Sequence, residues 1–214
     1  MRFFCGSLRG CRTKSEIIES KGGSTTYIHP YLLHGLQITR RNQVWSTDIS
    51  YIPMEHGFMY LYAVIDVYSR FIVGWRLSNS LSASNVYELM QECIDTHGAP
   101  EIVNTDQGSQ YTTSNWVNLL KANGIQISMD GKGRCKDNIW IERFWRSIKQ
   151  DYVYLHPTDS VSELRSGIDH WIRFYNNERP HQGIGGSTQK EFYFIFILLI
   201  GCQKIGTTIN FIER

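Results

Sequence analysis

The sequence predicts an α/β fold, a mixed five-stranded sheet flanked by helices, and three observations predict it. Three β-type segments, residues 43–52, 60–69 and 71–79, follow one another with only short turns between them. From residue 82 onward, helical periodicity alternates with short apolar runs. The chain has 214 residues and a hydrophobic share of 42%, which is enough to bury a core. Short turns imply an antiparallel meander, whereas parallel strands need helical crossovers.

An amphipathic helix opens the alternating part of the chain, over residues 82–98. Ser82 or Ser84 supplies the side-chain oxygen of a helix start, and Gly98 supplies a stop. Apolar side chains recur between them at helical spacing, at Val86, Leu89, Met90, Cys93 and Ile94. One face of this helix is therefore expected to pack on the sheet.

Strand and helix then alternate. The run "EIVNTD" at 101–106 predicts a short strand, "SNWVNLLKANG" at 114–124 a helix closed by glycine, and "IQISM" at 125–129 another strand. Parallel βα units are therefore expected to extend the meander on one side.

Two further helices are expected beyond the basic, glycine-punctuated loop "DGKGRCKD". One runs from about Asn138 to Tyr152, with Asn138 interpreted as its N-cap, and the other from about Ser160 to Asn176. The predicted order is β-β-β-α-β-α-β-α with a trailing helix. Three antiparallel strands and two parallel ones then share a sheet with helices on its faces.

The two ends differ from this folded core, which is expected over residues 41–186. Residues 1–40 have little periodicity and are expected to be poorly ordered or truncated. Residues 187–214 are interpreted as an atypical apolar tail because they contain "FYFIFILLIG". Those ten residues are about half of what spans a bilayer as a helix, so no membrane partner is expected.

Composition excludes several classes of protein. A net charge of +2 does not by itself indicate a nucleic-acid binder, so that function depends on where the charges cluster. The five cysteines show neither a CxxC pair nor a Cys/His cluster at zinc spacing, which indicates reduced thiols in a cytosol. No basic start followed by an apolar stretch indicates a signal peptide.

Three carboxylates occupy informative places in the predicted fold. Asp48 interrupts the first strand, where a charge beside a core is costly unless it is paired or on a metal. Asp106 follows the fourth strand, at the carboxyl edge where ligands bind in open sheets. Glu142 lies in the helix after the fifth strand. Taken singly, these residues also fit an outward-facing strand aspartate, an Asx turn, and a helix residue paired with Arg146.

Their combination favours a metal site. Two strand-borne aspartates and one helix-borne glutamate, contributed by separate elements, supply the oxygen ligands that hard cations prefer and leave positions open for water and phosphate. No Ser, Tyr or Cys nucleophile with a partnered base stands out in the sequence.

A resemblance to a known family makes this interpretation specific. The interval 142 − 106 − 1 = 35 residues, together with Asp48, resembles the D, D-35-E signature of retroviral-integrase-like recombinases. Over about residues 29–186 the chain resembles the second-reading-frame subunit of bacterial insertion-sequence transposases of family three. The resemblance is carried by "YLLHGLQITRRNQVWSTDISYIPM", "YLYAVIDVYSRFIVGW", "PEIVNTDQGSQYTTSNW", "GIQISMDGKGRCKDNIWIERFWRSIK" and "FYNNERPHQGIGG".

The resemblance implies a ribonuclease-H-like fold and a metal-dependent DNA transposase. Asp48, Asp106 and Glu142 would bind two Mg²⁺ or Mn²⁺ ions for in-line cleavage and strand transfer at a phosphodiester. No covalent protein intermediate is then needed.

Basic residues around this site are candidate DNA contacts. Lys149 follows Glu142 by two helical turns on about the same face, with Arg146 between them. An exposed surface lysine is the alternative for Lys149, and a solvated loop is the alternative for the basic residues of 130–137. For Arg179 and His181 the alternative is to tie the chain after the last helix to the catalytic face. The candidates for DNA binding are Lys149, Arg146, Lys132, Arg134, Lys136, Arg179 and His181.

The resemblance also implies partners and raises alternatives. The expected partners are the terminal repeats of the element and its target DNA, a first-frame helix-turn-helix subunit, and further copies of this chain when active. The expected location is the bacterial cytoplasm, in association with the nucleoid. Because both ends depart from the family pattern, a truncated, inactive DNA-binding relic is one alternative. A ribonuclease-H-type nuclease is another.

Overall fold

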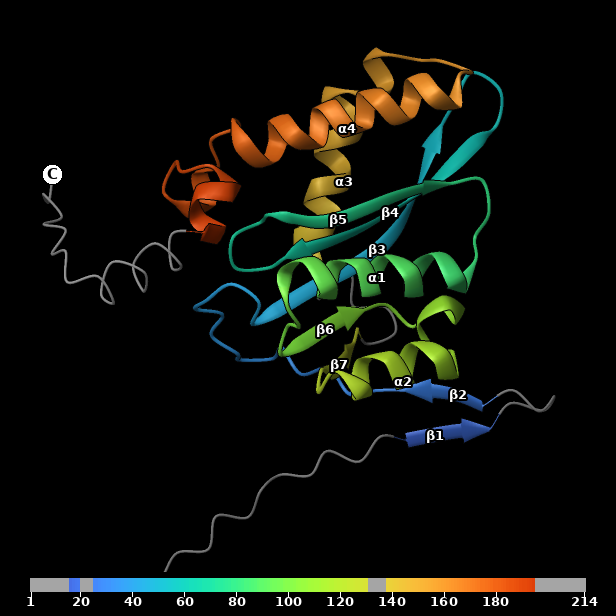
Figure 1. The fold of residues 1–214 in the computed structure, drawn as a ribbon, viewed down its shortest axis with the longest axis vertical. Helices are drawn as coiled ribbons and strands as arrows, with labels where there is room; N and C mark the ends of the chain where they lie inside the picture. The colour runs from blue at the N-terminus through green and yellow to red at the C-terminus, as the bar shows by residue number, and fades with distance from the viewer. Residues whose placement is uncertain (1–15, 20–24, 131–137, 195–214) are drawn as a thin grey trace, which may run out of the picture.

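The computed structural model describes residues 16–19, 25–130 and 138–194 of the chain. Its centre is a five-stranded sheet in the order β5-β4-β3-β6-β7 (Figure 1). The β3–β4 and β4–β5 pairs are antiparallel, and the β3–β6 and β6–β7 pairs are parallel. The predicted mixed sheet is confirmed. Its strands are β3 (Val44–Pro53), β4 (Phe58–Asp66), β5 (Ile72–Ser78), β6 (Ile102–Thr105) and β7 (Gln126–Met129).

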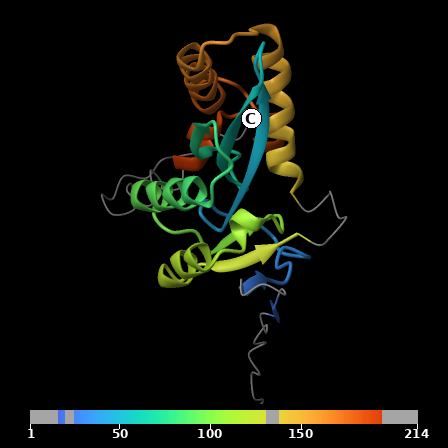
Figure 2. The same cartoon turned by 90° about the vertical axis from the view of Figure 1, so that its right-hand side faces the viewer.

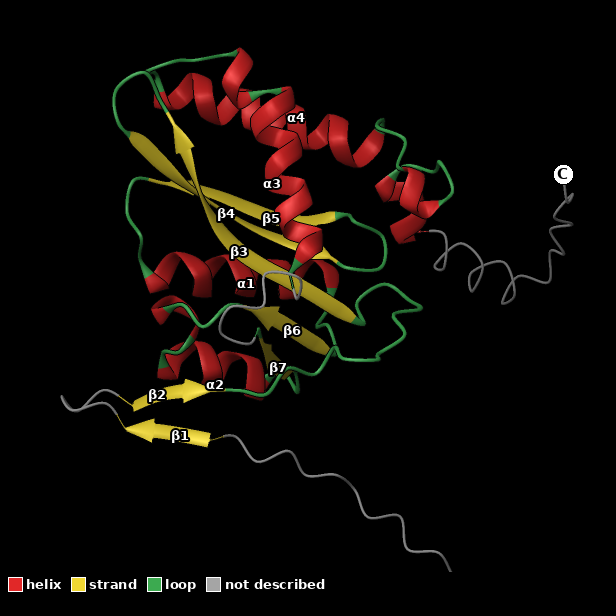
Figure 3. Ribbon diagram, turned by 180° about the vertical axis from the view of Figure 1, so that it is seen from behind, coloured by secondary structure: helices red, strands yellow, loops and turns green. Residues whose placement is uncertain are grey.

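Helices cover both faces of this sheet, as the view along its edge shows (Figure 2). Helices α1 and α2 lie on one side, and α3 lies on the other, where α4 crosses it (Figure 3). The helices are α1 (Ala83–His97), α2 (Ser114–Ala122), α3 (Ile139–Asp151) and α4 (Val161–Asn177). Three short 3-10 turns accompany them, η1 (Ser109–Tyr111), η2 (Val153–Leu155) and η3 (Gln182–Ile184).

Helix α1 has the caps that its sequence predicts. The Ser82 side chain accepts a hydrogen bond from the Ser84 amide at the start. At the end, Gly98 adopts a φ of 80° and donates its N–H to the Ile94 carbonyl. The five apolar residues predicted to face the sheet are all buried.

Strand β4 contributes side chains to two separate cores because its side chains alternate between the two faces of the sheet. Tyr62 and Val64 pack with α1 and α2, whereas Leu61, Ala63 and Ile65 pack with α3 and α4. The sheet is therefore buried on both sides along its centre. The long runs of apolar residues in this part of the sequence reflect that double burial.

The ordered chain begins before residue 41. Strand β1 (Glu16–Glu19) pairs antiparallel with β2 (Thr25–Ile28). Farther along, Leu33 is 6% exposed and packs with Val44 and Ile102, although residues 29–40 have no regular structure. This packing lacks a helical or strand period, which explains why the sequence pattern did not indicate it.

The ordered chain also extends beyond residue 186. Residues 189–194 are helical, and Tyr193 is fully buried. Its ring stacks on Phe71 with a centroid distance of 4.7 Å, and its hydroxyl donates to Asn42 Oδ1 at 2.7 Å. The first residues of the predicted tail therefore belong to the core, while residues 195–214 lie outside the described part of the chain. No helix among the described residues is long and apolar enough to cross a membrane.

Candidate active site

The sheet register places Asp48 beside Asp106. Strands β3 and β6 are parallel neighbours, and Ser46 lies opposite Asn104. Two residues farther along each chain, in the same direction, come Asp48 and Asp106. The first two carboxylates are thus brought together by strand pairing, although 57 residues separate them along the chain.

A side-chain hydrogen bond brings α3 to the same place. Trp145 donates its indole N–H to Asp48 Oδ2 at 2.9 Å. Glu142 is exposed in the first turn of α3, three residues before Trp145 and therefore about one turn away along nearly the same side. The charges of both Asp106 and Glu142 act on Asp48. The structure therefore brings the three carboxylates predicted from the sequence into one neighbourhood.

Asp48 carries a charge that its surroundings do not fully balance. Burial raises the pKa of its carboxyl to about 6, and the nearby charges of Asp106 and Glu142 add to that shift. The Trp145 hydrogen bond and the Ile49 amide oppose it. A carboxylate that is partly desolvated beside two others is a good ligand for a cation, because the cation supplies the missing positive charge.

The carboxylate site differs in ligand spacing from one other group of possible metal ligands. Among the described residues, one group of three His, Cys, Asp or Glu side chains has ligand atoms within 4.8 Å of one another, namely Glu55, His56 and Asp159. The carboxylates of Asp48, Asp106 and Glu142 are farther apart than that as a set.

Asp106 also forms the turn that its neighbours favour. Its side chain accepts a hydrogen bond from the Gly108 amide at 2.9 Å, as an Asx turn requires. Gln107 donates its side-chain amide to the Asp130 carbonyl at 2.9 Å and fixes the loop after β6. Asp106 Oδ1 is used by the turn, and the side chain remains exposed. The turn and a ligand role are therefore compatible.

The basic residues of α3 lie as the helical spacing predicts. Lys149 is half-buried; burial lowers the pKa of its ammonium, and the charge of Asp48 opposes that shift. Arg146 is exposed, and the described ion pairs do not include one between Glu142 and Arg146. The alternative role of Glu142, a solvated helix residue paired with Arg146, is therefore not supported by an ion pair among the described residues.

The remaining candidate DNA contacts divide into two groups. Lys132, Arg134 and Lys136 lie outside the described residues. Arg179 pairs with Asp151 of α3 at 2.8 Å and lies 5.9 Å from the ring centres of Trp171 and Tyr175. His181 accepts a hydrogen bond from the Gly183 amide at 3.1 Å. Arg179 therefore ties the chain after α4 to the end of α3.

Asn138 differs from its predicted role in one respect. It occupies the N-cap position of α3, but its side chain makes no capping hydrogen bond. Instead its side-chain oxygen accepts from the Ser46 hydroxyl, and both residues are buried. Asn138 thus joins the start of α3 to β3, two residues from Asp48. The sequence shows only a polar residue before a helix, which indicates a cap by default.

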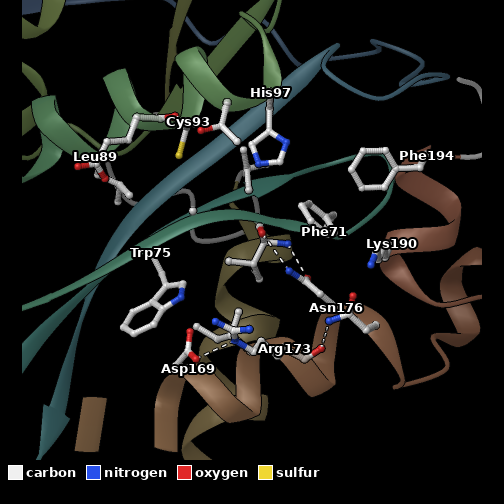
Figure 4. A pocket seen from close by; sticks show the side chains of 17 residues that line it. Phe71, Trp75, Leu89, Cys93, His97, Asp169, Arg173, Asn176, Lys190 and Phe194 are labelled. Atoms are coloured by element: carbon white, nitrogen blue, oxygen red, sulfur yellow. Dashed lines mark hydrogen bonds and ion pairs between the residues drawn. The ribbon is translucent and has the colours of Figure 1, made fainter. Parts of the chain in front are cut away.

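One well-defined cavity lies elsewhere. It has a volume of about 550 Å³ and lies at the β5 edge of the sheet, between α1 and α4 (Figure 4). Asn176 of α4 covers part of this edge, because its amide nitrogen and oxygen bond the Ile72 carbonyl and amide. Since β4 and β5 separate this cavity from β3, it is distinct from the carboxylate site.

Comparison with known proteins assigns the family. Two family models, both described as "Integrase core domain", match residues 38–135 and 123–188. The transposase for insertion sequence element IS904 of Lactococcus lactis is 36% identical over 188 residues, which are 86% of this chain and 74% of that protein. The chain belongs to the IS3 family of insertion-sequence transposases. Transposase InsF for insertion sequence IS3A of Escherichia coli K12 is 31% identical over 176 residues. This transposase chain spans 61% of the length of InsF.

Solved structures agree on the fold. The integrase catalytic core domain of HTLV-2, in complex with magnesium, aligns with a TM-score of 0.59 at 16% identity and covers 72% of this transposase chain and 97% of its own. The BIV integrase catalytic core aligns with a TM-score of 0.58 at 18% identity, covering 75% and 99% of the two chains. The predicted ribonuclease-H-like fold is thereby confirmed. The family is that of DDE-type polynucleotidyl transferases, and the comparisons favour neither the relic nor the ribonuclease.

Proposed function

We propose that this chain cleaves and joins DNA phosphodiesters at a centre formed by Asp48, Asp106 and Glu142. The observation that carries the proposal is the convergence of three elements on Asp48. Strand β6 is in parallel register with β3, and Trp145 of α3 donates to Asp48 Oδ2 at 2.9 Å. Family membership supports a polynucleotidyl transfer reaction at this centre.

The donor set fits two divalent cations of the Mg²⁺ or Mn²⁺ type. Carboxylate oxygens are hard ligands. Burial, with a smaller effect from the charges of Asp106 and Glu142, raises the pKa of Asp48, so a bound cation would favour its charged form. When bound, such ions activate the attacking water or 3′-hydroxyl and stabilise the leaving oxygen of an in-line displacement.

The residues around the carboxylates orient them or bind the DNA phosphates. Trp145 orients Asp48, and the turn at Gly108 aims Asp106. Lys149 is placed to neutralise a phosphate oxygen, since its ammonium lies within reach of the Asp48 charge. Arg146 is exposed on the same helix and contacts the DNA backbone.

The proposed partners are DNA and protein. The DNA comprises the terminal repeats of the element and a target, and the protein partners are a first-frame helix-turn-helix subunit and further copies of this chain. The HTLV-2 integrase core has been solved in a dimeric and a trimeric form, which supports self-association for the shared fold. The proposed location is the bacterial cytoplasm, near the nucleoid.

A strand-transfer assay tests the proposal. Purified protein and its partner subunit are incubated with labelled terminal-repeat DNA and Mn²⁺, and nicked and joined products are measured. Asp106→Asn keeps an oxygen to accept from Gly108 but removes the charge, so product is expected to fall at least about a hundredfold. Asp95→Asn is the matched control, because Asp95 is an exposed carboxylate on α1.

Two results would count against the proposed centre. One is product formation that does not depend on Mn²⁺, and the other is full activity of the folded Asp106→Asn variant. An RNA–DNA hybrid is included as a third substrate, and its cleavage in preference to terminal-repeat DNA would indicate a ribonuclease instead.

A further inference from the structure

A second cavity lies on the other flank of α3 and is strongly basic. It has a volume of about 440 Å³ and is lined by Arg70, Arg143, Arg179 and His181, with Trp140 and Ser147 on its α3 wall. None of its eleven lining residues is acidic. We call it the arginine pocket. Of these residues, the sequence indicated only Arg179 and His181 as candidate contacts.

Helical geometry separates the arginine pocket from the carboxylates. Trp140, Arg143 and Ser147 are spaced three and four residues apart and share one flank of α3. Glu142, Trp145 and Lys149 have the same spacing and share another. At about 100° per residue the two flanks lie on roughly opposite sides of the helix. Helix α3 therefore presents Glu142 of the carboxylate site on one side and Arg143 of the arginine pocket on the other.

Arg70 is held in the arginine pocket by a constrained turn. It adopts a φ of 65° between β4 and β5, a left-handed conformation that is uncommon for a residue other than glycine. Its guanidinium donates to the Val67 carbonyl and lies 5.6 Å from the centre of the Trp140 ring. The side chain is thus fixed by stacking and by its own turn, so it loses little freedom when it binds an anion.

The arginine side chains of the arginine pocket outnumber the carboxylates that act on them. Arg179 pairs with Asp151, and Asp66 acts on Arg70. Arg143 is exposed and forms no ion pair with another described residue. Burial lowers the pKa of His181, and the charges of Arg70, Arg179 and Arg143 lower it further. Several cations therefore face one polar cavity with too few anions among the described residues.

We propose that the arginine pocket binds a backbone phosphate of the DNA, at a nucleotide other than the one that reacts at the carboxylates. Planar guanidinium groups match the geometry of phosphate oxygens, and Ser147 adds a hydroxyl donor. A helix with its side chains is about 10–12 Å across, so a strand passing over α3 reaches both flanks with different phosphates. Arg146 and Arg143 lie along that path. This inference rests on the proposed function, which supplies DNA as the substrate.

Equilibrium binding without catalysis tests the inference. A fluorescently labelled DNA duplex is titrated with the full chain carrying Asp106→Asn in the presence of a chelator, and anisotropy is measured over a range of salt concentrations. Adding Arg143→Gln is expected to weaken binding about tenfold and to reduce the slope of log affinity against log salt by about 1. Arg173→Gln, which removes an exposed arginine from α4, is the control and is expected to change neither.

The position of the phosphate can be found with neutral methylphosphonate substitutions along the labelled strand. A methylphosphonate at one position, away from the reacting phosphodiester, is expected to weaken DNA binding by the Asp106→Asn chain about tenfold. The same substitution is expected to have little effect on DNA binding by the chain that also carries Arg143→Gln. Arg70→Lys keeps the charge but loses the planar fork, so an intermediate loss is expected. Thermal denaturation of each variant checks its folding.

The DNA-binding and strand-transfer results test the arginine pocket and the catalytic centre independently. Unchanged affinity and salt slope in folded Arg143→Gln would overturn the inference, whatever the strand-transfer assay shows. Inorganic phosphate is titrated into the same variants by calorimetry. Loss of phosphate binding in Arg143→Gln with unchanged DNA affinity would also overturn the inference, and would indicate a small phosphorylated ligand. Failure of Mn²⁺-dependent joining with an intact Arg143 effect would remove the catalytic proposal and leave the DNA contact in place.

Discussion

Trp145 donates its indole N–H to Asp48 Oδ2 at 2.9 Å, although the two residues are 97 positions apart in the chain. The contact joins α3 to the central strand at the carboxylate site. Trp145 is 7% exposed and packs in the core shared by the sheet, α3 and α4. The same side chain thus anchors the helix and orients a carboxylate.

Replacing Trp145 by phenylalanine is expected to weaken cation binding more than it weakens the fold. The ring keeps part of its packing against Phe144, but Asp48 loses a hydrogen bond that favours its charged form. A hydrogen bond to a charged group contributes about 1.5–3 kcal/mol, so Mn²⁺ affinity is expected to fall roughly tenfold or more. Isothermal titration calorimetry with Mn²⁺ measures the change.

Two controls make that titration specific. Trp171→Phe removes similar aromatic volume from the same core without touching Asp48, and is expected to leave Mn²⁺ affinity unchanged. His56→Gln removes a ligand from the exposed group of Glu55, His56 and Asp159, which is a competing place for a metal. Equal Mn²⁺ affinities for Trp145→Phe and Trp171→Phe would show that the indole N–H does not support the site.

The turn between β3 and β4 is expected to show a pH-dependent contact with the start of α4. Asp159 raises the pKa of His56 through a hydrogen bond and its charge, and His56 lowers the pKa of Asp159. The His56 contribution is complete below its ordinary pKa of 6.5 and is lost as the pH rises through the higher folded value. The Asp159 contribution is present above 3.8 and is lost as the pH falls through the lower folded value.

Proton NMR titration of the His56 ring tests this pair. The midpoint is expected above 6.5 in the native chain and near 6.5 in Asp159→Asn. Because both side chains are solvent-accessible, high salt is expected to reduce the shift. An unshifted His56 in the native chain at low salt would contradict the contact.

Most of the sheet and its helices could be predicted from the sequence because each element carries a local period or a cap. The Ser82 cap and Gly98 stop of α1 are local signals of this kind. The three carboxylates lie in β3, in α3 and directly after β6, and the order of these elements is set by similar signals. Their approach to one another follows from parallel pairing of β3 and β6. The order of these elements along the chain was predicted from the sequence, whereas the pairing of β3 with β6 comes from the structure.

Contacts that depend on distant residues could not be predicted in the same way. The Ser46–Asn138 hydrogen bond, the burial of Leu33 and the docking of Tyr193 have no local period. Arg70 and Arg143 lie 73 residues apart in the sequence and share a cavity only because α3 crosses the β4–β5 turn. Tertiary packing, not local preference, decides these positions.

Gly167 of α4 is expected to be intolerant of alanine. A β-carbon at this position would overlap the Tyr152 hydroxyl and ring at the end of α3. Alanine normally favours a helix over glycine by about 1 kcal/mol, but overpacking costs roughly 1–3 kcal/mol, so Gly167→Ala is expected to lower the free energy of unfolding. Urea denaturation measures it. In a Tyr152→Ala background the same substitution is expected to be neutral or stabilising; equal costs in both backgrounds would rule out the contact.

Tyr193 is expected to hold the C-terminal helical segment to the core. Its ring is fully buried and its hydroxyl donates to Asn42 Oδ1 at 2.7 Å. Tyr193→Phe removes the hydrogen bond and is expected to cost about 1 kcal/mol, while Tyr193→Ala leaves a cavity and is expected to cost about 3–5 kcal/mol. Tyr154→Ala is the control, because Tyr154 is 60% exposed, and a change within about 0.5 kcal/mol is expected. Thermal and urea denaturation measure the series. Equal stability of Tyr193→Ala and Tyr154→Ala would show that residues 189–194 add nothing to the core, because a buried aromatic ring cannot be removed from a packed core without cost.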